Sequence, residues 1–350
     1  EYNVPIPLIA SRRQIDSKNF DGGYVCNWDT KKFADYVLDN DKKGNVILSR
    51  DHGGPWQNSK EIEAKLGLER AMQSAKESFL VDIKSGFEII HIDPSIDFYS
   101  DPDTNTLLDR IFELYEYCFS ISQRFNREII FEIGTDEQSG STQSLEEVDY
   151  VLNSINDFCN KNKLPKPSFI VIQTGTKVME MRNIGSFDSP VRIAKEIPSE
   201  ILIPKVLEIC ESYNILLKEH NADYLSDMAL SWHPKLGISA ANVAPEFGVT
   251  ESKALYQLLI SEGLNKYAEE FITMSLNSNK WEKWLVENSK ATEIEKGLIA
   301  GHYIFSNNEF IELKTKISID LASRDILVDD VLKKAIKKAI LRYLFLFKVI

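Results

Sequence analysis

Acidic, basic and imidazole side chains recur at the ends of short apolar runs in this chain, about forty residues apart. Imidazole and carboxylate groups are the side chains that hold a divalent metal or move protons in enzymes. The runs are 46–49, 87–90, 128–131, 169–172 and 215–217, and the polar residues that follow them are Arg50, Asp51, His52, His91, Asp93, Glu132, Gln173, Gly175, Lys218 and His220. Their spacing predicts an active site built from several strand ends.

Each apolar run is short enough for a buried strand, and helix-patterned sequence fills the gaps between the runs. Strands are expected near 6–10, 45–49, 87–92, 128–133, 168–173, 214–218 and 235–241. This alternation predicts a (β/α)₈ TIM barrel, in which catalytic side chains lie at the C-terminal ends of the strands. Because eight strands are needed, we expect the first strand and helix of the barrel to precede Glu1.

The pattern changes after about residue 265, where strand-like runs become rare and the sequence indicates helices. We therefore expect two domains: a (β/α)₈ barrel over 1–263 and a helical C-terminal extension over 264–350.

Composition limits the possible partners. The 350 residues carry a net charge of −12, which argues against a nucleic-acid partner because phosphates would not be neutralised. No run approaches the roughly 20 apolar residues of a membrane span. The four cysteines form no CxxC pair and are interpreted as reduced thiols, so we expect a cytoplasmic protein.

The segment from Arg50 to Pro55 has the clearest chemical pattern. A strand leads an adjacent acid and imidazole into a Gly-Gly-Pro turn, whose glycines let the backbone approach a ligand closely. Neighbouring residues at a strand end point in different directions, so Asp51 and His52 could be a proton-transfer group and a metal ligand. The alternative is an Asp–His pair that caps the loop.

Two further strand ends carry ionisable groups. His91 and Asp93 lie on the same side of an extended segment and could reach a substrate hydroxyl or a metal-bound water. His91 could instead be a core histidine bonded to a backbone carbonyl. Glu132 ends a buried strand, where a carboxylate needs a charged partner or a metal.

The later strand ends predict metal and anion contacts. His220 is a candidate metal ligand, and Lys218 shares its face and could bind an anionic group; a Schiff-base role is the alternative. Gly175 and Asn242 stand where barrels often bind phosphate through backbone N–H groups. There is no Walker or dinucleotide glycine pattern, so the sequence does not support nucleotide binding.

Together these segments resemble one family, the non-catalytic-subunit type of class II tagatose-bisphosphate aldolases (KbaZ/GatZ-like). The family's GGDHLGP is similar to residues 49–55, its IHLDCS to 90–95, its VIGTE to 132–136, its VVQPG to 171–175 and its EAHSTDYQ to 219–224. Residues 9–24 resemble a further conserved segment of that family, and the matches run in order from about residue 8 to 260.

The resemblance implies a class II aldolase-like barrel. It implies that Asp51 is the proton-transfer residue and that His52 and His220 bind zinc. A third zinc histidine of such aldolases falls at Gln173, a poor zinc ligand, for which Glu132 or His91 would substitute unless the metal is absent. Arg50 stands where the family has glycine and could bind a negatively charged substrate.

We therefore expect a class II aldolase-like enzyme that makes or breaks a carbon–carbon bond in a phosphorylated sugar or sugar acid with a divalent metal, zinc first. The alternative is a non-catalytic subunit that stabilises a tagatose-bisphosphate-type aldolase. The expected partners beyond substrate are a second copy of the chain or a companion aldolase subunit. The expected site comprises catalytic Asp51 and Glu132, metal ligands His52, His220 and Gln173, and substrate contacts Arg50, His91, Asp93, Lys218, Gly175 and Asn242.

Overall fold

The computed structural model describes residues 3–135, 144–172, 176–184 and 197–350. The chain divides into two compact units. The first lies within 1–175, 195–220 and 236–240, and the second within 176–194, 221–235 and 241–350. The predicted boundary between residues 263 and 264 stays a prediction.

Among the described residues, the first unit is built on one curved sheet with the strand order β1-β2-β3-β4-β5-β8-β9. Neighbouring strands from β1 to β8 pair in parallel. The strands are β1 (Ile6–Ser11), β2 (Val46–Gly53), β3 (Ile89–Ile92), β4 (Ile130–Gly134), β5 (Phe169–Val171), β8 (Leu216–Glu219) and β9 (Ala240–Ala241). Each lies within or beside one of the seven predicted runs, so the predicted barrel-type α/β fold is confirmed.

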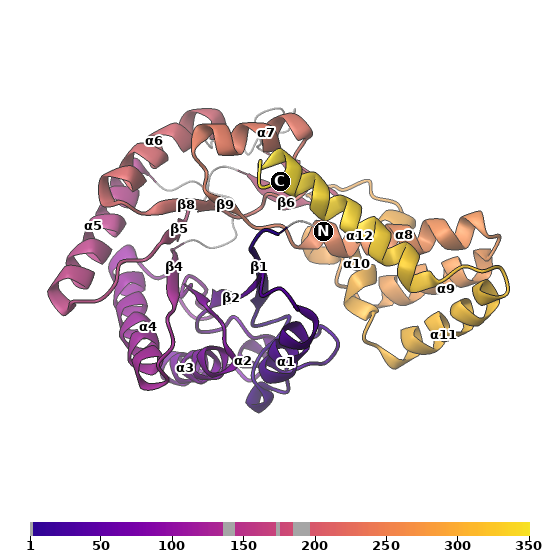
Figure 1. The fold of residues 1–350 in the computed structure, drawn as a ribbon, viewed down its shortest axis with the longest axis horizontal. Helices are drawn as coiled ribbons and strands as arrows, with labels where there is room; N and C mark the ends of the chain where they lie inside the picture. Colours follow the sequence, from indigo (N-terminus) through magenta and orange to yellow (C-terminus); the bar gives the residue numbers. More distant parts are fainter. Residues whose placement is uncertain (1–2, 136–143, 173–175, 185–196) are drawn as a thin grey trace. The chain divides into compact units, whose positions relative to one another are not determined.

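Helices between these strands lie along the outer side of the curved sheet (Figure 1). They are α1 (Thr30–Asn40), α2 (Ser59–Glu63), α3 (Leu68–Ser85), α4 (Thr104–Arg124), α5 (Leu145–Asn162) and α6 (Ser199–Tyr213), with a 3₁₀ turn η1 (Lys18–Phe20). Asp29, Asp103 and Ser144 accept hydrogen bonds from backbone N–H groups in the first turns of α1, α4 and α5, as their sequence positions predict. Because the strands from β1 to β8 pair in parallel, their C-terminal ends lie at one edge of the sheet.

The second unit contains helices and one antiparallel hairpin. Its elements are β6 (Lys177–Met179), β7 (Arg182–Ile184), α7 (Asp227–Leu236), α8 (Pro245–Ser261), α9 (Asn265–Asn277), η2 (Glu282–Trp284), α10 (Glu293–Ala300), η3 (Gly301–Ile304), α11 (Asn308–Ala322) and α12 (Val328–Leu346). Phe271, Phe310 and Ile317 are among the apolar side chains of its core. Residues 264–350 are all described and contain no strand, so the predicted helical C-terminal part is confirmed. Among the helices described, none has the length and apolar character that crossing a membrane requires.

Candidate metal centre

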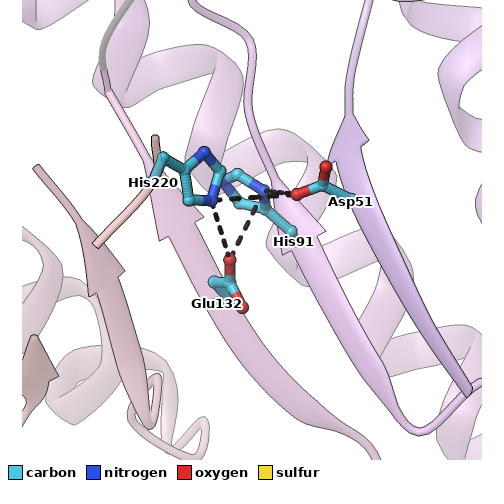
Figure 2. Close-up of side chains that lie close together, drawn as sticks. All are labelled: Asp51, His91, Glu132 and His220. Atoms are coloured by element: carbon cyan, nitrogen blue, oxygen red, sulfur yellow. Dashed lines mark ion pairs between the residues drawn. The ribbon is translucent and has the colours of Figure 1, made fainter. Parts of the chain in front are cut away.

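Four side chains, three from neighbouring strands and one from the end of a strand farther along the sheet, converge at the C-terminal strand ends of the first unit (Figure 2). Asp51 comes from β2, His91 from β3, Glu132 from β4, and His220 directly follows β8. Each offers one nitrogen or oxygen, and these atoms lie within 4.8 Å of one another. All four side chains are largely buried. We call these residues the four-residue centre.

Strand register explains why these residues meet. In the parallel sheet His91 is the direct partner of Glu132, and Asp51 is the partner of Ser11, the last residue of β1. Side chains of one strand alternate between the two faces of a sheet, so paired residues of neighbouring strands point to the same face. The register therefore places an imidazole beside a carboxylate at the same height in the barrel.

The spacing within the centre suits a shared cation. Glu132 Oε1 lies 3.5 Å from His91 Nδ1 and 3.7 Å from His220 Nε2. Asp51 Oδ1 lies 3.6 Å from His91 Nδ1 and 3.7 Å from His220 Nε2. These separations exceed a normal hydrogen bond of about 2.7–3.2 Å. They are close to the separation of two ligands that each lie about 2.0–2.2 Å from one tetrahedral zinc ion. The donor set therefore fits a divalent metal.

Both carboxylates of the centre are held in the ionised state. Burial raises the pKa of Asp51, but the neighbouring imidazoles, His52 foremost, outweigh burial and hold this pKa well below its usual range. Burial also raises the pKa of Glu132, yet the charge of Lys218 and the imidazoles bring that pKa to about 2. Two buried carboxylates that face one space need positive charge between them.

The imidazole of His220 is in the state that a metal ligand requires. Burial lowers the pKa of His220 to about 4, although the nearby carboxylates of Glu132 and Asp51 act to raise it. The ring is therefore neutral at physiological pH and has a nitrogen lone pair to offer a cation.

His91 is oriented by its neighbours. Its Nδ1, which lies 3.5 Å from Glu132 Oε1 and 3.6 Å from Asp51 Oδ1, accepts a hydrogen bond from the backbone N–H of His52 at 3.1 Å. A metal at the centre would compete with that N–H group. The opposite nitrogen, Nε2, lies against Gly134, where a Cβ atom would come within 2.5 Å of it. Glycine at position 134 therefore makes room for the ring.

Lys218 forms the closest contact of the centre. Its Nζ donates to both oxygens of Glu132, at 2.8 and 2.7 Å, and both side chains are buried. The predicted substrate-contact residue is thus held by a carboxylate of the centre. An ammonium in this position balances the charge of Glu132 and competes with any cation that shares this carboxylate.

His52 lies beside the four-residue centre and is not one of its members. Its backbone φ is 44°, in the left-handed region, and the register between β2 and β3 shifts between Arg50 and Gly53. This turn directs His52 Nδ1 to Asp93 Oδ2 at 2.6 Å, while Nε2 lies 3.8 Å from Asp51 Oδ2. Burial lowers the pKa of His52, but Asp51 and Asp93 outweigh burial and raise it to about 9.

The two glycines after His52 allow this loop to approach β3. A Cβ on Gly53 would come within 2.6 Å of the carbonyl oxygen of His91, and one on Gly54 within 2.1 Å of that of Asp93. The backbone N–H of Asp93 donates to Gly53 at 2.7 Å. The close approach brings the Asp93 carboxylate to His52. The glycines thus let the backbone approach β3, and a close approach to a ligand stays a prediction.

Arg50 is not brought into the centre. Its guanidinium is fully buried and donates to both oxygens of Asp82, at 2.7 and 2.6 Å. Its remaining nitrogen donates to the carbonyl oxygens of Ala10 and Ile15, at 2.7 and 2.8 Å. This arrangement directs Arg50 toward the chain itself, and a substrate contact is not part of it.

The remaining predicted site residues are Gln173, Gly175 and Asn242. Gln173 and Gly175 are outside the described residues. Asn242 belongs to the second unit, where its carbonyl oxygen accepts from the N–H of Ala222 at 3.2 Å.

The sequence did not predict His91 as a first-choice metal ligand. The signal was available: the apolar runs 87–90 and 128–131 have the same length, and each is followed at once by an ionisable residue. Aligning the two runs as parallel neighbours pairs His91 with Glu132, as the register shows.

Comparison with known proteins shows the fold. No protein-family model matches the chain, and no curated protein matches its sequence. A solved structure of a probable tagatose 6 phosphate kinase from Sinorhizobium meliloti 1021 is similar over 98% of this chain and 93% of that chain, with a TM-score of 0.73 and 17% identity. A glycerol complex of the fructuronate-tagaturonate epimerase UxaE from Cohnella laeviribosi is similar over 99% of this chain and 83% of that chain, with a TM-score of 0.54 and 10% identity. Both likenesses are of fold, and they agree with the barrel-type α/β fold that the sequence predicted.

Proposed function

We propose that the first unit is a metal-dependent enzyme of the class II aldolase type, which makes or breaks a carbon–carbon bond in a phosphorylated sugar or sugar acid. The observation that carries this proposal is the convergence of two imidazoles and two carboxylates at 3.5–3.7 Å on the C-terminal strand ends. The resemblance of residues 49–55 and 90–95 to the aldolase family supports the same assignment.

In this proposal His91, Glu132 and His220 hold the metal. Two imidazoles and one carboxylate form a ligand set of catalytic zinc sites and leave further coordination positions for substrate. Zinc is therefore the first metal to test. When bound, the metal would polarise the substrate carbonyl and stabilise negative charge that develops on it.

Asp51 is the proposed proton-transfer residue. Its Oδ2 faces His52 Nε2 at 3.8 Å, and His52 in turn is bonded to Asp93 at 2.6 Å. This chain of acid, imidazole and acid distinguishes Asp51 from Glu132, whose charge is balanced by Lys218. The positively charged His52 ring keeps the neighbouring Asp51 carboxylate ionised, and an ionised carboxylate can accept a proton from substrate.

In the cleavage direction, Asp51 would take the proton of the hydroxyl group that lies β to the substrate carbonyl. The bond between the carbon next to the carbonyl group and the carbon that bears the hydroxyl group then breaks. Its electron pair remains with the carbonyl half as an enolate, and the hydroxyl carbon becomes a new carbonyl. Return of a proton to the enolate carbon completes the reaction, and synthesis is the reverse.

A non-catalytic role is the second candidate function. It is favoured by Gln173, which stands where the resemblance implies a third zinc histidine. In that case the chain would stabilise a companion aldolase subunit and would have no activity of its own.

The test uses protein stripped of metal with a chelator and reloaded with zinc. Carbon–carbon cleavage and formation are measured on phosphorylated ketoses, ketohexuronates, and dihydroxyacetone phosphate with aldehydes. We expect Asp51→Asn to lower the rate by roughly 10²–10⁴, the usual worth of a positioned acid or base, with zinc content unchanged. Asp39→Asn, at an exposed position of α1, is the matched control.

An unchanged rate in Asp51→Asn would assign Asp51 to loop structure. A wild-type chain that is inactive with zinc on every substrate, and that activates or stabilises a companion aldolase, would establish the subunit function instead.

A further inference from the structure

We propose that Arg13 is the anion anchor of this site and binds the phosphate or carboxylate group at the end of the substrate. The inference rests on the proposed function and identifies the part of the chain that recognises the charged end of the sugar. Arg50, which the sequence suggested for this role, is directed to Asp82 instead.

The end of β1 places Arg13 at the edge of the sheet that carries the metal centre. Ser11, the last residue of β1, is the register partner of Asp51. The chain then turns, because the N–H groups of Gln14 and Ile15 both donate to the carbonyl oxygen of Ser11 at 3.0 Å. Arg13 lies within this turn, two residues beyond Ser11, and therefore starts from the C-terminal edge of the barrel.

Contacts on both sides fix the backbone at Arg13. Its carbonyl oxygen accepts from the N–H of Tyr24 at 3.1 Å. The preceding residue, Arg12, is buried and donates to the carbonyl oxygen of Gly54 at 2.7 Å and to Asp16 at 2.9 Å. The turn is thus tied to the loop that carries His52, and the Arg13 side chain begins from a defined position.

Arg13 differs from the other cationic side chains at this edge because no carboxylate among the described residues pairs with it. Arg12 pairs with Asp16, Arg50 with Asp82 and Lys218 with Glu132. Within the described part of the chain, the half-buried Arg13 forms no ion pair. Its guanidinium is left to bind an external anion.

The guanidinium of Arg13 lies in the neighbourhood of His52. Burial and the charge of Arg13 both act to lower the pKa of His52, against the carboxylates that raise it. The His52 ring is in turn 4.9 Å from the His220 ring, measured between centroids. An anion bound by Arg13 would therefore lie on the His52 side of the centre.

The negative charges of the site explain why an anion would bind at Arg13 and not at the centre. Three buried carboxylates, Asp51, Asp93 and Glu132, face or flank the centre and would repel an anionic substrate. A guanidinium presents a planar fork of N–H donors that matches the oxygens of a phosphate or a carboxylate. Arg13 would draw the charged end of the substrate away from the carboxylates and leave its carbonyl end for the centre.

The test compares Arg13→Met with Arg70→Met, an exposed arginine of α3, in zinc-loaded protein. Affinity is measured by calorimetry for two matched pairs: dihydroxyacetone phosphate with dihydroxyacetone, and fructuronate with fructose. We expect Arg13→Met to weaken binding of the anionic member by about 10- to 100-fold, the worth of charge-assisted hydrogen bonds. The neutral member and the Arg70→Met variant should be unaffected, and Arg13→Lys should recover part of the loss.

The larger loss identifies the anion: phosphate if it falls on dihydroxyacetone phosphate, carboxylate if it falls on fructuronate. The inference is overturned if Arg13→Met binds both members of each pair like the wild type, or if it loses the neutral member equally. Failure of the proposed function is separate. Wild type that takes up no zinc at the centre would refute the metal assignment, and inorganic phosphate binding to wild type and Arg13→Met would still test the anchor.

Discussion

Two clusters of buried charged side chains lie in the first unit, and they differ in how tightly their charges are paired. In the supporting network, comprising Arg12, Asp16, Arg50, Glu61 and Asp82, the ion pairs are 2.6–2.9 Å long. In the four-residue centre the nitrogen–oxygen separations are 3.5–3.7 Å. Buried charge alone therefore does not mark a functional site. A network whose ion pairs are in direct hydrogen-bond contact stabilises the fold. A cluster whose polar atoms are separated like the ligands of one metal ion is suited to bind a cation.

The largest expected effect is in the supporting network. Arg50→Met leaves Asp82 buried without its partner, and breaking a buried pair in this way costs about 3–5 kcal/mol of unfolding free energy. Urea denaturation of the variant and of Arg70→Met measures the difference. If Arg50→Met lost no more unfolding free energy than Arg70→Met, the pairing of Arg50 with Asp82 would not stabilise the fold, and the contrast between the two clusters would be wrong.

The centre should respond in the opposite manner. His220→Asn removes a neutral ligand and leaves no charge unpaired, so the unfolding free energy of metal-free protein should change little. Zinc affinity should fall by more than about 100-fold, because residues that only support ligands are already worth about 10- to 100-fold. Calorimetric zinc titration measures this. An unaltered zinc affinity would remove His220 from the ligand set.

The pH dependence of stability should separate His52 from both clusters. Its pKa is raised in the folded state from an ordinary 6.5 to about 9, so its contribution is fully present below pH 6.5 and is lost as the pH rises through 9. We expect metal-free protein to lose on the order of 3 kcal/mol over this window. Asp93→Asn removes the partner at 2.6 Å and should reduce the loss. Identical stability curves for the variant and the wild type would contradict the assignment.

The smallest expected change is at Lys218, where the two kinds of pairing meet. Lys218→Met removes an ammonium group that competes with the metal for Glu132. The repulsion between this ammonium group and a metal ion about 4 Å away is at most several kcal/mol in a partly buried site. Zinc affinity should therefore rise by about tenfold, equivalent to about 1.4 kcal/mol. The metal-free variant should be less stable and should regain stability on adding zinc. A fall in affinity would mean that Lys218 positions Glu132 for the metal.

Much of the fold could be predicted from the sequence because apolar runs and helix caps are local signals. The seven runs correspond to the strands of the sheet, and Asp29, Asp103 and Ser144, which are residue types that cap helices, stand directly before α1, α4 and α5. Such features depend on residues within one turn or one strand, so the chain carries them without knowledge of distant contacts.

The candidate site could be predicted less completely from the sequence than the fold, for two physical reasons. Strand alternation does not hold through His52, because its left-handed φ of 44° turns the side chain out of register toward Asp93. For the other residues, contacts between parts of the chain that are distant in sequence determine whether a side chain faces the site. Arg50 is held by Asp82, 32 residues away in sequence, and no local pattern distinguishes such an arginine from one that faces a substrate. Arg13, in the same way, was not singled out before the turn after β1 was known.

The most direct test of the central claim is anomalous diffraction at the zinc edge from crystals of the zinc-loaded protein. We predict one strong peak coordinated by His91 Nδ1, Glu132 Oε1 and His220 Nε2 at about 2.0–2.2 Å. The absence of a peak between these atoms in fully loaded crystals would contradict the account, as would a peak coordinated by His52 in place of His91.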